Sequence, residues 1–177
     1  MNVEAMNVAT TSEGNAATVQ AFCNDHTAIR VSNIERASAF YASAFGATPL
    51  TNPFVLEGPF AEAMMNGPVS VRFKMRHLQC AGGVIELFEF LEPVAPTRAL
   101  HATESSILHI GIRVNDVDAV AARVIDAGGA LIIPVTQWGE WKLTFCTDPD
   151  GNVLEIADGS IQELIRATAE DFPEARL

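Results

Sequence analysis

The sequence predicts an α+β protein built from two βαβββ modules, whose curved mixed sheets carry their helices on the outside. Three observations support this fold class. A strand led by a histidine occurs twice, as DHTAIRV (25–31) and LHIGIRV (108–114). After each of these strands, apolar residues recur at helical spacing. Each half then closes with a similar strand, GGVIELFEF (82–90) in the first and GNVLEIAD (151–158) in the second.

Local signals predict the first strand and the helix of each module. His109 lies 83 residues after His26, and the same offset brings Gly46 onto Gly129. Both strands are followed directly by residue types that are preferred at helix N-caps. These N-cap candidates are Ser32, Asn33, Asn115 and Asp116. Gly46 and the pair Gly128–Gly129 mark the helix ends, because glycine readily takes the left-handed conformation that follows a helix.

The rest of each module is expected to supply further strands. The closing strands lie 69 residues apart, so the second module is 14 residues shorter than the first. Proline and glycine residues at 51–68 indicate that the extra length forms an irregular excursion. VSVRFKMRH (69–77) and WKLTFCT (141–147) alternate apolar and polar residues as strands do. DPDG (148–151) favours a type I turn, which would make the last two strands a hairpin.

These patterns divide the chain into four segments. A flexible N-terminal tail is expected at 1–21 and the first βαβββ module at 22–95. A linker and the second module follow at 96–158. The C-terminal helix and tail at 159–177 include an amphipathic stretch that would cover the modules or join a partner chain.

Composition excludes several classes of function. The chain has 22 acidic and 11 basic residues, and its net charge of -11 disfavours binding to nucleic acids. Its three cysteines are far apart and form no CxxC motif, which suits buried thiols in a reducing compartment. The N-terminus lacks the pattern of a secretory signal, and no apolar run approaches the roughly 20 residues that a membrane span needs. We therefore expect a cytoplasmic protein that binds no membrane.

Each module contains one histidine at its first strand and one glutamate inside its last. A lone strand histidine is more often a hydrogen-bonded core residue, and a lone glutamate usually faces solvent. Here His26, Glu86, His109 and Glu155 stand at equivalent points of an internal repeat. Imidazole nitrogen and carboxylate oxygen are good ligands for divalent first-row metals. The repeat therefore favours one metal site shared by the two modules.

The same segments resemble a known family. HTAIRV, FYASAFGA, VIELFEF, HIGIRVND and DPDGNVLEI are similar to the vicinal oxygen chelate superfamily, which includes glyoxalase I, bleomycin resistance proteins and extradiol dioxygenases. The resemblance covers about residues 24–158. It implies a glyoxalase-like fold in which paired modules cup one divalent metal ion (Ni, Co, Zn, Mn or Fe). Carried over by position, its ligands are His26, Glu86, His109 and Glu155.

Strand alternation identifies the neighbours of these ligands, because residues two apart point to the same side of a strand. Arg30 and Arg113 either hold an anionic substrate group or lie farther out in solvent. Phe88, beside Glu86, is a candidate contact for the substrate. His77 and His101 fall outside the repeat and are expected at the surface.

The resemblance and the ligand set together predict a metal-dependent enzyme that acts on a small carbonyl substrate. The metal would stabilise an enediolate, and Glu86 or Glu155 would move the proton, as in a glyoxalase I-like lyase or an epimerase (isomerase). A non-haem iron dioxygenase for a catechol-like substrate is the alternative, although it needs only two histidines and one glutamate. A small-molecule-binding resistance protein is a third reading. We expect a homodimer, with each site formed within one chain or across two.

Overall fold

The computed structural model describes residues 24–65, 70–94, 102–171 and 174. The tail predicted at 1–21 and His101 lie outside the described residues. The first module contains β1 (His26–Val31), α1 (Ile34–Phe45), β2 (Thr48–Pro49), β3 (Phe54–Glu57), α2 (Pro59–Met64), β4 (Arg72–Cys80) and β5 (Gly83–Glu92). The second part contains η1 (Ala102–Glu104), β6 (Ile110–Arg113), α3 (Val117–Asp126), β7 (Ala130–Leu131), β8 (Thr136–Trp138), β9 (Trp141–Thr147), β10 (Val153–Ala157) and α4 (Ile161–Asp171).

Two mixed sheets of five strands each confirm the predicted α+β fold. The strand order is β1-β5-β4-β2 in one sheet and β6-β10-β9-β7 in the other. In both sheets the first and last strands of the module pair in parallel, and the last two strands pair antiparallel. Each module thus follows the predicted βαβββ path. A short additional strand, β3 or β8, pairs with β4 or β9.

The helices begin where the N-cap signals place them. The Asn33 side chain accepts a hydrogen bond from the backbone N–H of Arg36 (2.8 Å) at the start of α1. Asp116 does the same for the N–H of Ala119 (2.9 Å) at the start of α3. Gly46 ends α1 in the left-handed region, with a φ of 70°. Local capping therefore sets both helices in register with the strands that precede them.

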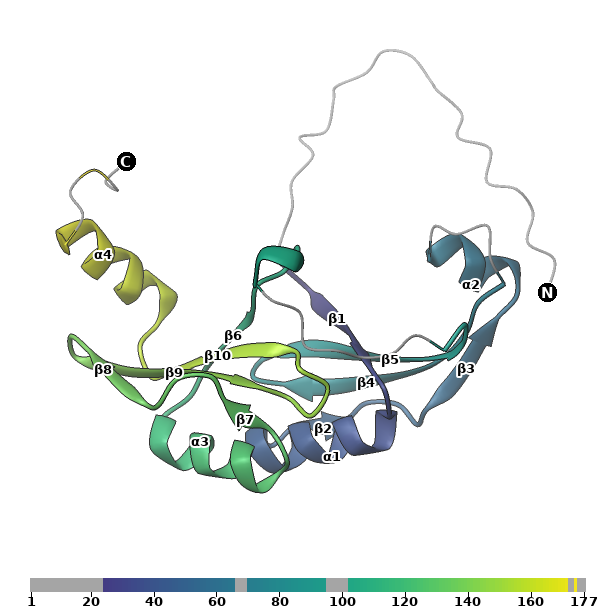
Figure 1. Ribbon diagram of the computed structural model, residues 1–177, viewed down its shortest axis with the longest axis horizontal. Helices are drawn as coiled ribbons and strands as arrows, with labels where there is room; N and C mark the ends of the chain where they lie inside the picture. The colour runs from purple at the N-terminus through teal and green to yellow at the C-terminus, as the bar shows by residue number, and fades with distance from the viewer. Residues whose placement is uncertain (1–23, 66–69, 95–101, 172–173, 175–177) are drawn as a thin grey trace, which may run out of the picture.

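The sheets lie side by side, and α1 and α3 pack against each other beneath them (Figure 1). One continuous apolar core fills the space between these helices and both sheets. Its largest fully buried members are Val31, Ile34, Phe40, Tyr41, Leu78, Leu87, Val117, Val124, Leu154 and Ile156. The other face of the sheets is open, with α2 and α4 standing at its two ends (Figure 1). We call this the open face.

The excursion predicted at 51–68 is more regular than expected. It contains β3, which pairs with β4, and the short helix α2. Ala61 of α2 is completely buried against Phe73, Met75 and Phe88 on the open face of the first sheet. Local proline and glycine signals did not reveal this helix, because its formation depends on that tertiary contact. None of the described helices is long and apolar enough to cross a membrane.

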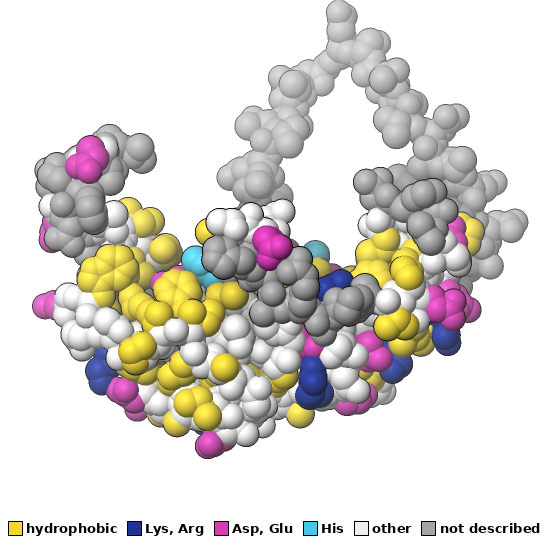
Figure 2. All heavy atoms as spheres, viewed as in Figure 1, with side chains coloured by type: hydrophobic (Ala, Val, Ile, Leu, Met, Phe, Trp, Pro, Cys, Tyr) yellow, Lys and Arg dark blue, Asp and Glu magenta, His cyan; other side chains and the backbone are white. Residues whose placement is uncertain are grey.

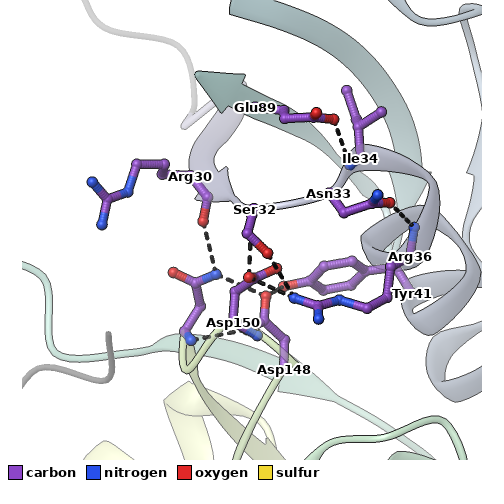
Figure 3. A network of polar contacts seen from close by, with 10 residues as sticks. Arg30, Ser32, Asn33, Ile34, Arg36, Tyr41, Glu89, Asp148 and Asp150 are labelled. Atoms are coloured by element: carbon purple, nitrogen blue, oxygen red, sulfur yellow. Dashed lines mark hydrogen bonds and ion pairs between the residues drawn. The ribbon is translucent and has the colours of Figure 1, made fainter. Parts of the chain in front are cut away.

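A buried polar network joins the DPDG turn of the second module to the first module (Figure 3). Oδ1 of Asp150 accepts hydrogen bonds from the backbone N–H of Ser32 (3.1 Å) and from the guanidinium of Arg36 (2.7 Å). Oδ2 of Asp148 accepts one from the hydroxyl of Tyr41 (3.1 Å). Asp148 and Tyr41 are almost inaccessible to solvent. We call these contacts the inter-module network.

Asn152 completes the network. Its Nδ2 donates to Oδ2 of Asp148 (2.7 Å) and to the carbonyl oxygen of Arg30 in β1 (3.1 Å). Burial raises the pKa of the Asp148 carboxyl, and hydrogen bonds from Asn152, Asp150 and Tyr41 oppose that rise. The network therefore fixes the position of β1 relative to the second module through contacts that are far apart in the sequence.

Candidate functional site

The first histidine–glutamate pair lies on the open face of the first sheet. β1 and β5 run parallel in a register that places Ala28 beside Glu86. His26 is two residues before Ala28, so its side chain emerges on the same face as that of Glu86. Nε2 of His26 lies 3.7 Å from Oε2 of Glu86. The His26 side chain is half exposed, whereas the Glu86 carboxylate is mostly buried.

The second pair repeats this arrangement in the second sheet. The parallel register of β6 and β10 places Gly111 beside Glu155, and His109 is two residues before Gly111. Nε2 of His109 lies 3.0 Å from Oε2 of Glu155. The equivalence predicted from the repeat thus extends to the register of the strands. In each module the histidine and the glutamate contact each other on the open face.

His77 is not the surface residue that the sequence suggested. It lies opposite Glu86 in the antiparallel pair of β4 and β5, and its Nε2 is 3.0 Å from Oε1 of Glu86. Only 26% of its side chain is exposed. The two residues that form the turn before β5, Ala81 and Gly82, both have positive φ (48° and 83°). This tight turn sets the register that brings His77 to Glu86.

The histidines of the two pairs line a common groove, but the pairs do not merge into one cluster. Both His26 and His109 line a groove between β1 and β6. Among the described residues of a single chain, no three His, Cys, Asp or Glu side chains gather in an arrangement that could hold a metal ion. We call His26 with Glu86, and His109 with Glu155, the two half-sites. In each half-site the histidine and the glutamate contact each other.

The predicted substrate-contacting residues lie on β1, β5 and β6, in different environments. Arg30 is exposed, and its guanidinium points away from the inter-module network (Figure 3). Arg113 is also exposed, and its Nε donates to the carbonyl oxygen of Asp158 (3.3 Å). Phe88 is only 7% exposed, and its ring packs against that of Phe73 at a centroid distance of 5.2 Å. Phe88 thus forms part of an apolar cluster under α2.

Large apolar side chains are exposed around the open face. They come from β3, α2, the segment before β6, β8 and α4: Phe54, Phe60, Met64, Ile107, Leu108, Trp138, Ile161 and Ile165. Figure 2 shows apolar side chains toward both ends of this face, with histidine side chains between them. Exposed apolar patches of this kind are typical of surfaces that bind a partner or a ligand.

The family is established by comparison with known proteins. The model of the Glyoxalase/Bleomycin resistance protein/Dioxygenase superfamily matches residues 24–156, which include both modules and all four residues of the two pairs. The chain belongs to this superfamily. The resemblance to the vicinal oxygen chelate proteins is therefore confirmed. No curated protein sequence matches the chain.

Solved structures share the fold at low sequence identity. A glyoxalase family protein from Bacillus cereus has a TM-score of 0.70 at 20% identity, over 81% of this chain and 97% of that one. The fosfomycin resistance protein FosX from Listeria monocytogenes has a TM-score of 0.56 at 16% identity, over 84% and 99% of the two chains. A glutamate-to-glutamine mutant of FosX, solved with Mn(II) and 1S,2S-dihydroxypropylphosphonic acid, has a TM-score of 0.55 at 16% identity, over 84% and 98%.

Proposed function

We propose that this protein is a divalent-metal-dependent enzyme whose active sites form between the two chains of a homodimer. The observation that carries the proposal is the matched pair of half-sites. His26 with Glu86 and His109 with Glu155 occupy equivalent positions on the same face, yet they remain apart within one chain. A second chain that places its second sheet over the first sheet of this one would unite complementary half-sites.

The open face suits such a partner. In a two-fold symmetric dimer both chains use the same surface patch for the contact, so each dimer would contain two equivalent sites. The exposed apolar side chains from α2, α4 and neighbouring strands would be buried in the contact, which favours association. This arrangement accounts for both the open face and the separation of the half-sites.

The donor set fits a divalent ion. Two imidazole nitrogens and two carboxylates offer the ligand types that Mn, Fe, Co, Ni and Zn accept, and the two negative charges offset that of the ion. His26, Glu86, His109 and Glu155 would hold it. When bound, the metal would polarise a carbonyl of the substrate and stabilise the enediolate formed from it.

The residues of the chain supply the remaining steps. A glutamate at the site accepts a proton from the carbon next to the carbonyl and returns it to a neighbouring atom. In this proposal Arg30 and Arg113, which are exposed on β1 and β6, hold an anionic group of the substrate. This chemistry makes the protein a glyoxalase I-like lyase or an isomerase for a small carbonyl compound.

A second candidate, a metal-dependent resistance enzyme, is favoured by the Mn(II) in two FosX structures with this fold. Four available ligands argue against the iron dioxygenase, which needs three. Assays of a methylglyoxal hemithioacetal, acyl-CoA epimers, fosfomycin and catechols separate these functions. Oxygen consumption during turnover would favour the dioxygenase.

Mixing two defective chains tests the intersubunit site. His26→Ala and Glu155→Ala homodimers should each lose metal binding. Heterodimers formed after chain exchange should regain one intact site, so random mixing restores about a quarter of the wild-type sites. Light scattering should give a dimer mass for every protein. Exchanged mixtures that bind no metal, or a monomer mass at all concentrations, would contradict the proposal.

A further inference from the structure

The two glutamates of the proposed metal site have different neighbours, although the repeat makes them equivalent. Oε1 of Glu86 lies 3.0 Å from Nε2 of His77, and Oε2 lies 3.7 Å from Nε2 of His26. The two oxygens of this carboxylate therefore face different histidines. His77 comes from β4, outside the strands that carry the repeated pairs.

His77 is itself held in one orientation. The Oγ1 of Thr51 accepts a hydrogen bond from the backbone N–H of His77 (3.1 Å) and lies 3.3 Å from its Nδ1. The ring of Phe54 stacks on the imidazole, with centroids 5.9 Å apart and an interplanar angle of 20°. These contacts fix both the position and the plane of the ring.

The hydrogen-bond partners of the ring indicate its tautomer. The carboxylate of Glu86 can only accept a hydrogen bond, so Nε2 of His77 is the donor in their contact. Since Oγ1 of Thr51 already accepts from the backbone, its hydroxyl proton is available to Nδ1 of His77. A neutral imidazole that accepts at Nδ1 carries its proton on Nε2 and donates from there. The result is a directed chain in which the Thr51 hydroxyl donates to His77 and His77 donates to Oε1 of Glu86. Oε2 then remains available on the side of His26.

Within the described part of the second module, no counterpart of this chain of hydrogen bonds is found. The residue opposite Glu155 in the register of β9 and β10 is Phe145, whose side chain cannot donate a hydrogen bond. The Phe145 ring instead contacts His109 edge to face, with centroids 5.3 Å apart. On the antiparallel neighbouring strand, Glu86 thus faces a histidine, whereas Glu155 faces a phenylalanine.

We propose that His77 is a positioning residue that orients Glu86 as a metal ligand, with the Thr51 hydroxyl supporting the Nε2–H tautomer of its ring. The inference rests on the proposed metal site. Partners that hydrogen-bond to a ligand carboxylate fix its orientation, and their loss typically weakens metal binding by about 10–100-fold. Glu86 is accordingly the restrained glutamate, and Glu155 keeps more freedom to move.

Calorimetric titration of the full-length, metal-free protein with Mn(II) tests the proposal. His77→Phe copies the residue of the second module and should weaken Mn(II) binding by about 10–100-fold. His77→Gln keeps an N–H donor near the position of Nε2 and should restore most of the affinity. Thr51→Val removes the hydroxyl but keeps the shape of the side chain, and should cause a smaller loss.

A second readout requires no metal. In ¹⁵N-imidazole NMR spectra of the metal-free protein, His77 should be the Nε2–H tautomer, and Thr51→Val should weaken that preference. This measurement also shows whether a variant is folded. Unchanged Mn(II) affinity in folded His77→Phe, with binding lost in Glu86→Ala, would overturn the role of His77. Wild-type affinity in Glu86→Ala would instead overturn the metal site itself, and the inference with it.

Discussion

Replacing Tyr41, the only tyrosine of the chain, with phenylalanine should weaken the inter-module network without disturbing the core. The hydroxyl donates to Oδ2 of Asp148 at 3.1 Å, and the side chain is completely buried. Asp148 would keep three donors, namely the backbone N–H groups of Asp150 and Asn152 and the side chain of Asn152. Phenylalanine preserves the packing of the ring, so the change isolates one hydrogen bond.

The expected loss follows from the charge of the acceptor. A hydrogen bond to an ionised group contributes about 1.5–3 kcal/mol, so Tyr41→Phe should lower the free energy of unfolding by that amount at neutral pH. Urea unfolding followed by tryptophan fluorescence would measure it, with an unchanged m-value showing that the folded state remains compact. A fluorescence change is available because the chain has two tryptophans.

The pH dependence of this loss has a defined sign. Burial raises the pKa of Asp148 in the folded protein, so protonation of this carboxyl favours the folded state. This contribution to stability is full below the pKa of Asp148 in the unfolded chain, and it is lost as pH rises through its pKa in the folded protein. As pH falls through that folded pKa, the carboxyl becomes neutral and the bond from Tyr41 is worth only about 0.5–1.5 kcal/mol. The difference between wild type and Tyr41→Phe should therefore shrink in acid. A loss below about 0.5 kcal/mol at neutral pH, or one that does not change with pH, would refute this reasoning.

Three further experiments test other parts of the structure. Because His77 restrains Glu86, Glu155→Gln should lower turnover more than Glu86→Gln does. The expected loss is about 10²–10⁴-fold, with the metal retained. Unchanged turnover in both metal-loaded variants would argue against glutamate-mediated proton transfer. Gly129→Ala would press a Cβ against the backbone oxygen of Thr147 in β9, so thermal unfolding should show a loss of about 1–3 kcal/mol, whereas an unchanged midpoint would contradict that contact. Burial raises the pKa of the Cys146 thiol to about 12 and also raises that of Cys80. Alkylation at pH 8 should therefore modify both thiols only after unfolding. Rapid labelling of these two thiols in the native protein would contradict their burial.

The sequence predicted the parts of the fold that depend on local periodicity. Side chains two apart on a strand share a face, so the alignment of the repeat alone places His26 and Glu86 in one module and His109 and Glu155 in the other. N-cap residues and glycines likewise predicted α1 and α3. These features need no knowledge of how the strands pair.

The contact of His77 with Glu86 depends on the register of β4 and β5, which the sequence does not reveal. A two-residue turn with positive φ at both positions usually contains asparagine or aspartate followed by glycine. Here the turn is Ala81–Gly82, and alanine disfavours the conformation it adopts. Because the sequence does not predict this turn, it does not predict the register of β4 and β5 either. His77 therefore looks like a residue outside the repeat.

The DPDG segment (148–151) forms tertiary contacts that its local turn preference does not predict. Its residues favour a turn, and the structure has that turn, but Asp148 and Asp150 also extend from it into the first module. This docking, with the packing of α1 against α3, holds the two sheets side by side and turns both half-sites to the same open face. Two half-sites that lie apart within one chain do not together surround one ion. If the proposed dimer is correct, the inter-module network sets how well the half-sites of two chains align, although it contains no metal ligand.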